Sequence, residues 1–89
     1  MLDYNILPER MRSAARMYIE DGIDPGSFMQ AVLENDFVVA VQKADTYNRA
    51  YLDAFAQLVY WEIPSAAWGS KTVVREWISS GGTNGQKEE

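Results

Sequence analysis

The sequence predicts an all-α fold, in which four to five short helices pack around one longer helix at about residues 45–62. Three observations support this fold class. Apolar residues recur at helical spacing in several segments, no second segment offers a partner for a strand, and residues 79–89 lack any large apolar side chain. We therefore predict one small helical domain over residues 1–78 and a disordered tail over residues 79–89.

The first two helices are predicted from their ends. Proline suits a first helical turn, so the first helix is expected from Pro8 to about Asp21, with Gly22 ending it in a left-handed conformation. Its core-facing stripe follows helical spacing and comprises Met11, Ala14, Ala15, Tyr18 and Ile19. Asp24 is then expected to cap a short second helix that begins at Pro25 and ends near residue 35.

The next segment permits two interpretations. Asp36 fits the cap of a helix over residues 37–44, but the β-branched side chains in this run also allow a strand. Because such a strand would have no partner elsewhere in the chain, we predict a helix.

The longer helix carries the strongest pattern. One face of residues 45–62 comprises Tyr47, Ala50, Tyr51, Ala54, Phe55, Leu58 and Val59. The helix is expected to end at Ile63, because Pro64 crowds the preceding residue out of the helical region. A loop over residues 65–69 leads to Ser70, which is expected to cap the last helix. The buried side of that helix comprises Val73, Val74, Trp77 and Ile78.

The composition narrows the chemistry that the chain can perform. It contains no cysteine and no histidine, which excludes disulfides, thiol nucleophiles, imidazole bases and every zinc motif built on these residues. The serines therefore lack a histidine base, and the carboxylate pairs fall at predicted helix ends, where they serve as caps. We predict that the protein is not an enzyme and uses no cofactor and no metal.

Charge and hydropathy indicate where the protein acts. The net charge of −5 disfavours contact with a phosphate backbone, so we expect no direct binding to nucleic acid. No apolar run approaches the ~20 residues of a membrane span, and the first residues lack the basic region of a signal peptide. Together with the lack of cysteine, this predicts a cytoplasmic protein without a membrane partner.

Residues 68–72, with the sequence Trp-Gly-Ser-Lys-Thr, combine a predicted helix start with a lysine and an aromatic ring. Helix starts expose unpaired N–H groups, so this segment would suit a phosphate or a nucleotide held by Lys71 and stacked on Trp68. The same residues also suit an ordinary cap at Ser70 with Trp68 in the core, and this is the favoured interpretation. A nucleotide-hydrolysing loop is excluded, because Pro64 stands where its upstream glycine belongs and no strand precedes it.

The chain contains more aromatic residues than so small an interior can bury. Three Trp, five Tyr and three Phe occur in 89 residues, and several cluster around Pro64. Such a surplus marks an interface more often than a substrate pocket, and homo-oligomerisation would also bury it. The candidate surface for a protein partner or a small anionic ligand comprises Tyr60, Trp61, Trp68, Gly69, Ser70, Lys71 and Thr72.

Several blocks of this chain resemble a group of short open reading frames from phages and prophages. The blocks are residues 18–23, 25–28 and 31–36, the Ala44-Asp45 step, and Pro64 followed by residues 68–70. The resemblance covers roughly residues 8–78 and carries no known activity or functional residue. It implies a phage or mobile-element origin. Small accessory proteins of that origin often counter host defence.

The leading hypothesis is therefore a phage-type accessory protein that acts in the host cytosol by stoichiometric binding to a host protein. An alternative is an oligomeric sponge that sequesters a nucleotide-type signal at residues 68–72. A structural or assembly component of the virion is a third possibility.

Overall fold

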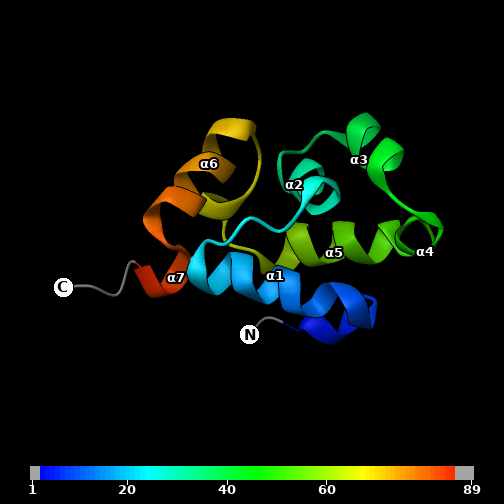
Figure 1. The fold of residues 1–89 in the computed structure, drawn as a ribbon, viewed down its shortest axis with the longest axis horizontal. Coiled ribbons are helices and arrows are strands. Elements are labelled where there is room, and N and C mark those ends of the chain that lie inside the picture. Colours follow the sequence, from blue (N-terminus) through cyan, green and yellow to red (C-terminus); the bar gives the residue numbers. More distant parts are fainter. Residues whose placement is uncertain (1–2, 86–89) are drawn as a thin grey trace.

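The computed structural model describes residues 3–85, and these form helices and connecting loops with no strand (Figure 1). The predicted all-α fold is confirmed. The molecule is elongated, with extents of 42 × 25 × 20 Å. In Figure 1, α1 (Glu9–Asp21) and α5 (Leu52–Glu62) both extend along the long axis, and α2 (Ser27–Leu33), α3 (Phe37–Lys43) and α6 (Lys71–Ser80) lie above them.

Helix α1 (Glu9–Asp21) follows its prediction closely. Pro8 precedes its first residue, and Gly22 ends it in the left-handed conformation at φ 68°. The 3-10 turn η1 (Tyr4–Ile6) packs beneath α1 because the Arg12 guanidinium donates to the backbone oxygens of Leu7 and Asn5. Arg12 thus ties the N-terminal segment to the helix.

Helix α2 (Ser27–Leu33) begins two residues later than predicted. The Asp24 carboxylate accepts the N–H of Gly26 at 2.9 Å, so it closes a tight turn and does not cap the helix. Gly26 then takes a φ of 95°, which redirects the chain before the helix starts. The prediction that Asp24 caps this helix was therefore wrong.

Helix α3 (Phe37–Lys43) confirms the helical alternative for the β-branched run. Its cap is the predicted one, since the Asp36 carboxylate accepts the N–H of Val39 at 3.4 Å. The helix packs against α2, and Ala40 is its only buried residue. Most of the apolar surface of α3 therefore lies outside the core.

The predicted long helix is divided into α4 (Thr46–Arg49) and α5 (Leu52–Glu62). The N–H groups of Ala50 and Tyr51 bond three residues back instead of four, which tightens the turn and changes the helix direction. The Arg10 guanidinium holds this corner, 3.4 Å from the Asp45 carboxylate and 4.9 Å from the Tyr47 ring centre. Tyr47 and Tyr51 are therefore on the surface and do not continue the core-facing stripe of α5.

The 3-10 turn η2 (Ser65–Ala67) leads to α6 (Lys71–Ser80), where Ser70 caps the helix as predicted by accepting the N–H of Val73. The chain then continues into α7 (Gly82–Gly85), which lies against the end of α1 (Figure 1). The predicted tail therefore starts too early: residues 79–80 belong to α6, Gly81 ends that helix, and residues 82–85 form α7. Residues 86–89 lie outside the described residues.

Helix α7 is held by a close backbone contact and by polar hydrogen bonds, which explains why the hydropathy pattern did not predict it. A Cβ on Gly22 would stand 2.8 Å from the backbone nitrogen of Gly82, so the two chain segments touch directly. The Thr83 hydroxyl donates to the oxygen of Ile19 at 3.1 Å, and the Asn84 amide donates to the Asp21 carboxylate at 2.8 Å. None of these contacts needs an apolar side chain.

The core joins α1, η2 and α6 through two buried aromatic residues. The Tyr18 hydroxyl donates to the oxygen of Ala67 at 2.7 Å, and the Trp77 indole N–H donates to the oxygen of Tyr18 at 3.0 Å. Both polar groups are thereby satisfied inside the protein. Phe28 and Phe55 meet edge to face at 5.0 Å between ring centres and bring α2 onto α5.

Candidate functional site

The main hollow of apolar character lies between α5 and the α2–α3 pair, and we call it the aromatic groove. Its volume is about 280 Å³. It exists because α3 packs on α2 and leaves one side open toward α5. The lining residues are Val32, Asn35, Asp36, Phe37, Ala40, Leu52, Phe55, Ala56, Val59, Tyr60 and Trp68.

Aromatic rings form one edge of the aromatic groove. Tyr60 and Trp61 on α5 are 65% and 70% exposed, and their rings meet edge to face with centres 4.8 Å apart. Trp68 is half-buried and lies 6.4 Å from the Tyr60 ring, so it joins the rim to the groove floor. The structure therefore brings together the three aromatic residues that the sequence singled out, with two of them on the surface.

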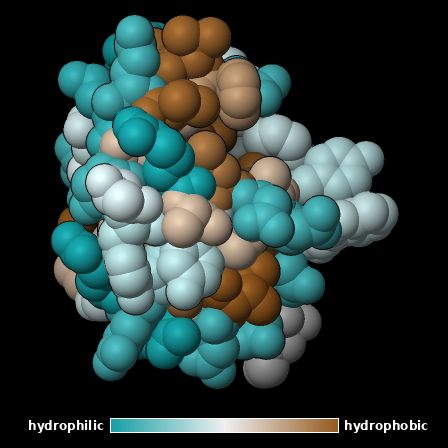
Figure 2. All heavy atoms as spheres, turned by 90° about the vertical axis from the view of Figure 1, so that its right-hand side faces the viewer, coloured by the Kyte–Doolittle hydropathy of each residue, from teal (hydrophilic) through white to brown (hydrophobic). Residues whose placement is uncertain are grey.

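The opposite edge belongs to α3 and was missed by the sequence analysis. Phe37 is 73% exposed and Val38 is 64% exposed, and the top of the molecule in Figure 2, where α3 lies, is correspondingly hydrophobic. The signal was present: five of the seven residues of α3 are apolar, and one helix face cannot bury all of them. The sequence did not show which of them stay exposed, because the partner surface of α3 is a tertiary property.

The charge around the aromatic groove is acidic. Asp36 lines the groove, and Asp53 is exposed on α5, seven residues before Tyr60 and therefore on the same side of that helix. Among the described residues, no lysine or arginine lines the groove. A ligand that enters it meets apolar walls flanked by carboxylates.

Three of the other predicted site residues, Gly69, Ser70 and Lys71, lie on the far side of residues 35–37, where they line an open hollow of about 440 Å³. Two of the hydrogen-bonding groups before this helix are already engaged within the protein. The Gly69 N–H donates to the oxygen of Leu33 at 2.7 Å, and the Ser70 hydroxyl accepts the N–H of Val73. Thr72 is exposed and does not line the hollow.

Carboxylates also surround that helix start. The Lys71 ammonium lies 3.4 Å from the Glu34 carboxylate, which is only 14% exposed, and Asp36 borders the same hollow. An anion at residues 69–72 would have to displace the Ser70 cap and compete with Glu34 for the lysine. The arrangement favours an ordinary helix start over a phosphate site.

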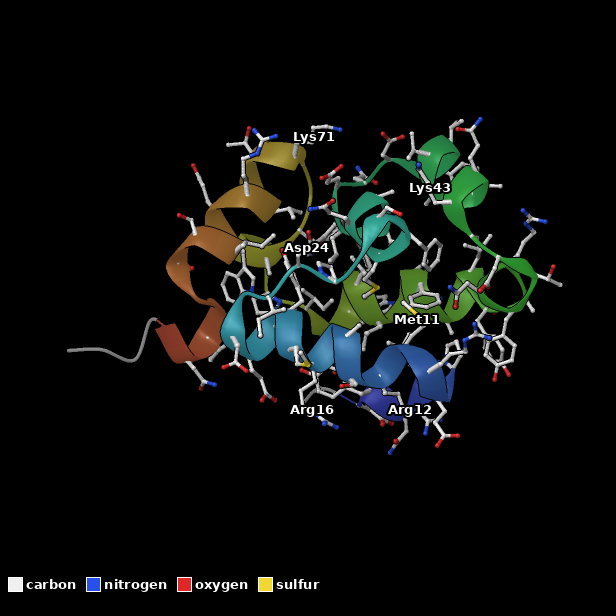
Figure 3. The ribbon with its side chains drawn as sticks, in the orientation of Figure 1. Met11, Arg12, Arg16, Asp24, Lys43 and Lys71 are labelled. Atoms are coloured by element: carbon white, nitrogen blue, oxygen red, sulfur yellow. The ribbon has the colours of Figure 1, made fainter. Side chains whose placement is uncertain are left out.

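The three arginines of α1 are engaged within the molecule. Arg10 binds Asp45 at the α4 corner, Arg12 donates to two backbone oxygens, and Arg16 lies 5.4 Å from the ring centre of Tyr4. Figure 3 shows Arg12 and Arg16 on the outer side of α1, far from Lys71 and Lys43. The basic character of this helix is thus structural.

Other chemical features of the described residues are limited. Burial raises the pKa of Tyr18 well above its ordinary value, with a smaller contribution from the Glu34 charge, so the hydroxyl stays protonated and donating. Within residues 3–85, no group of three acidic side chains gathers to hold a metal ion, and none of the helices is long and apolar enough to span a membrane. No protein family, curated protein or solved structure matches this chain.

Proposed function

We propose that this chain is a non-enzymatic accessory protein of the phage type that binds a host protein stoichiometrically through the aromatic groove. The observation that carries the proposal is the exposure of Tyr60 and Trp61, at 65% and 70%, directly beside an apolar groove. Tyrosine and tryptophan are the residue types on which interface energy concentrates, because they bury a large area at a small entropy cost.

The exposed rings have little structural purpose in the isolated chain. Buried residues of the same types, Tyr18 and Trp77, already hold the core together through their hydrogen bonds. Phe37 on α3 and Tyr60 on α5 both line the groove, and the Trp61 ring packs against Tyr60 at its rim, so exposed apolar surface lies on both sides of one hollow. Apolar surface gathered in this way is typical of a protein-binding site.

The charges indicate the chemistry of the partner. Asp36 and Asp53 flank the groove, so it complements a segment with a bulky apolar anchor and neighbouring lysine or arginine side chains. An amphipathic helix presents such anchors at i, i+3 and i+4 on one face. A second copy of this chain would bring the same carboxylates together, so a host protein fits better than self-association.

The nucleotide-sponge alternative has less support. Its predicted residues are a capped helix start and a lysine that pairs with Glu34. The assembly-component alternative rests on the phage resemblance alone and has no site of its own.

The proposal is tested by quantitative capture from a lysate of the host. We expect the immobilised protein to retain one partner at a molar ratio near one, and calorimetry with the purified partner to show that Trp61→Ala weakens binding at least about 30-fold, or ~2 kcal/mol. Ile23→Ala is the matched control, because Ile23 is 45% exposed and lies outside the aromatic groove. Equal affinity of wild type and Trp61→Ala would refute the site, and an empty capture would refute the function.

A further inference from the structure

A second groove lies between α2 and α6, at the end of α3, and we call it the basic groove. Its volume is about 310 Å³. Apolar residues, Ala31, Val39 and Val74 among them, line part of it, and three cationic side chains border it: Lys43, Lys71 and Arg75. We propose that the basic groove binds a small phosphate monoester that carries an apolar body. This site is separate from the aromatic groove and does not depend on the proposed function.

The distribution of cations supports the site. The chain has a net charge of −5, yet three of the seven lysines and arginines among the described residues border this one groove. The other four bind partners inside the molecule, including Arg49, whose guanidinium donates to the oxygen of Ala44 at 3.2 Å. By contrast, Lys43 and Arg75 make no hydrogen bond and no ion pair with any residue between 3 and 85.

The single carboxylate of the basic groove is confined to one end. Glu34 follows the last residue of α2 and binds Lys71 at 3.4 Å. Ser27, the first residue of α2, lies seven residues earlier, which corresponds to about 10 Å of helical rise. Arg75 lies one turn along α6 from Lys71. The rest of the groove therefore offers unpaired positive charge away from the carboxylate.

The donors around that part of the groove suit a phosphate group. The Arg75 guanidinium supplies a planar fork of N–H groups, and the Lys43 ammonium supplies a compact charge. Gln30 and Ser27 add an amide and a hydroxyl from α2. Figure 3 shows Lys43 and Lys71 on the same side of the molecule, on elements to either side of α2.

The shape and the floor of the groove define the rest of the ligand. A volume of about 310 Å³ is in the range of small-molecule sites, and the apolar floor would cover an aromatic or aliphatic body. An extended polyanion is disfavoured by the overall charge of −5, so nucleic acid is not the expected ligand. A phosphate monoester with an apolar body matches both the cationic border and the apolar floor of the groove.

The test is a titration of the full chain with phenyl phosphate, followed by two-dimensional NMR of the backbone amides. Phenol and inorganic phosphate serve as probes for each half of the ligand. We expect phenyl phosphate to bind with a Kd of about 1 mM or tighter, several-fold tighter than either half, with shifts confined to α2, α6 and the end of α3. Lys43→Gln and Arg75→Gln should each weaken binding at least about fivefold.

Arg16→Gln is the matched control, because it removes the same charge from the opposite side of the molecule (Figure 3). Its affinity should equal that of the wild type. The proposal is overturned if phenyl phosphate causes no localised shifts, if Arg16→Gln weakens binding as much as Arg75→Gln does, or if phenol or inorganic phosphate binds as tightly as the monoester. Amide spectra of each free variant establish that it is folded.

Discussion

Two regions of this molecule use their aromatic residues in opposite ways. We call the region where α1, α6 and α7 meet the sealed end, and the region along α3 and the outer side of α5 the open end. Where α1, α6 and α7 meet, Tyr18 and Trp77 are buried and every polar atom of their rings donates a hydrogen bond. Along α3 and the outer side of α5, Phe37, Tyr60 and Trp61 are mostly exposed, and a groove separates the helices. A chain of this size thus seals one part of its interior fully and keeps apolar surface elsewhere, so the residues that stabilise the fold differ from those of the proposed binding surface.

The strongest expected effect comes from the sealed end. Trp77→Ala should lower the free energy of unfolding by about 3–5 kcal/mol, because it removes a buried indole and leaves a cavity. Urea denaturation followed by circular dichroism measures the loss. Trp77→Phe keeps most of the burial and loses the hydrogen bond to Tyr18, so a decrease of about 1–2 kcal/mol is expected. A loss below 1 kcal/mol for Trp77→Ala would contradict the assignment of stability to this end.

The backbone contact between α1 and α7 should come next. Gly22→Ala places a methyl group 2.8 Å from the nitrogen of Gly82 and imposes a φ of 68° on alanine. We expect a loss of about 1–3 kcal/mol and faster hydrogen exchange at residues 83–85. Asn84→Ala, which removes one exposed hydrogen bond to Asp21, provides a milder comparison. Unchanged exchange in Gly22→Ala would show that α7 does not depend on this close approach.

Alkaline pH should weaken the same end gradually. Burial raises the pKa of Tyr18 above its ordinary value, so the unfolded chain releases this proton first as the pH rises. The contribution is complete below about pH 10 and declines above it, by up to ~1.4 kcal/mol per pH unit. Denaturation curves at several pH values between about 8 and 11 measure the slope. Tyr18→Phe should reduce the slope, whereas Tyr60→Phe, at an exposed phenol, should retain it.

The smallest effects on stability are expected at the open end. Trp61→Ala and Phe37→Ser should each change the free energy of unfolding by less than about 0.5 kcal/mol, because the solvent already surrounds most of both side chains. The same denaturation experiment applies. A loss above 1 kcal/mol for either variant would mean that these residues support the fold, and the contrast between the two ends would disappear.

Local signals predicted the helices well. Gly22, Asp36 and Ser70 end or begin helices where the sequence placed them, because each of these residues acts on its own neighbours. The break after Arg49 was not predicted, since no glycine or proline marks it and the Arg10 contact that holds the corner comes from a distant helix.

The exposure of Tyr60 and Trp61 could be predicted from the number of aromatic residues, whereas the contribution of α3 to the same surface depended on geometry. An excess of aromatic residues near Pro64 sufficed to place Tyr60 and Trp61 on the surface. The contribution of α3 depends on its packing mainly against α2, and the placement of Lys43 and Arg75 along one groove is likewise a tertiary property. Both are consequences of how helices dock, which periodicity along one helix does not encode.

The three tryptophans occupy three environments, with Trp77 buried, Trp68 half-buried and Trp61 70% exposed. The fluorescence of each tryptophan therefore reports on a different region of the protein. Indole emission shifts to longer wavelength with contact to water, so a variant that keeps Trp61 alone would shift to shorter wavelength when a partner covers it. In a second variant that keeps Trp77 alone, a shift to longer wavelength would report unfolding, and neither measurement needs an attached dye.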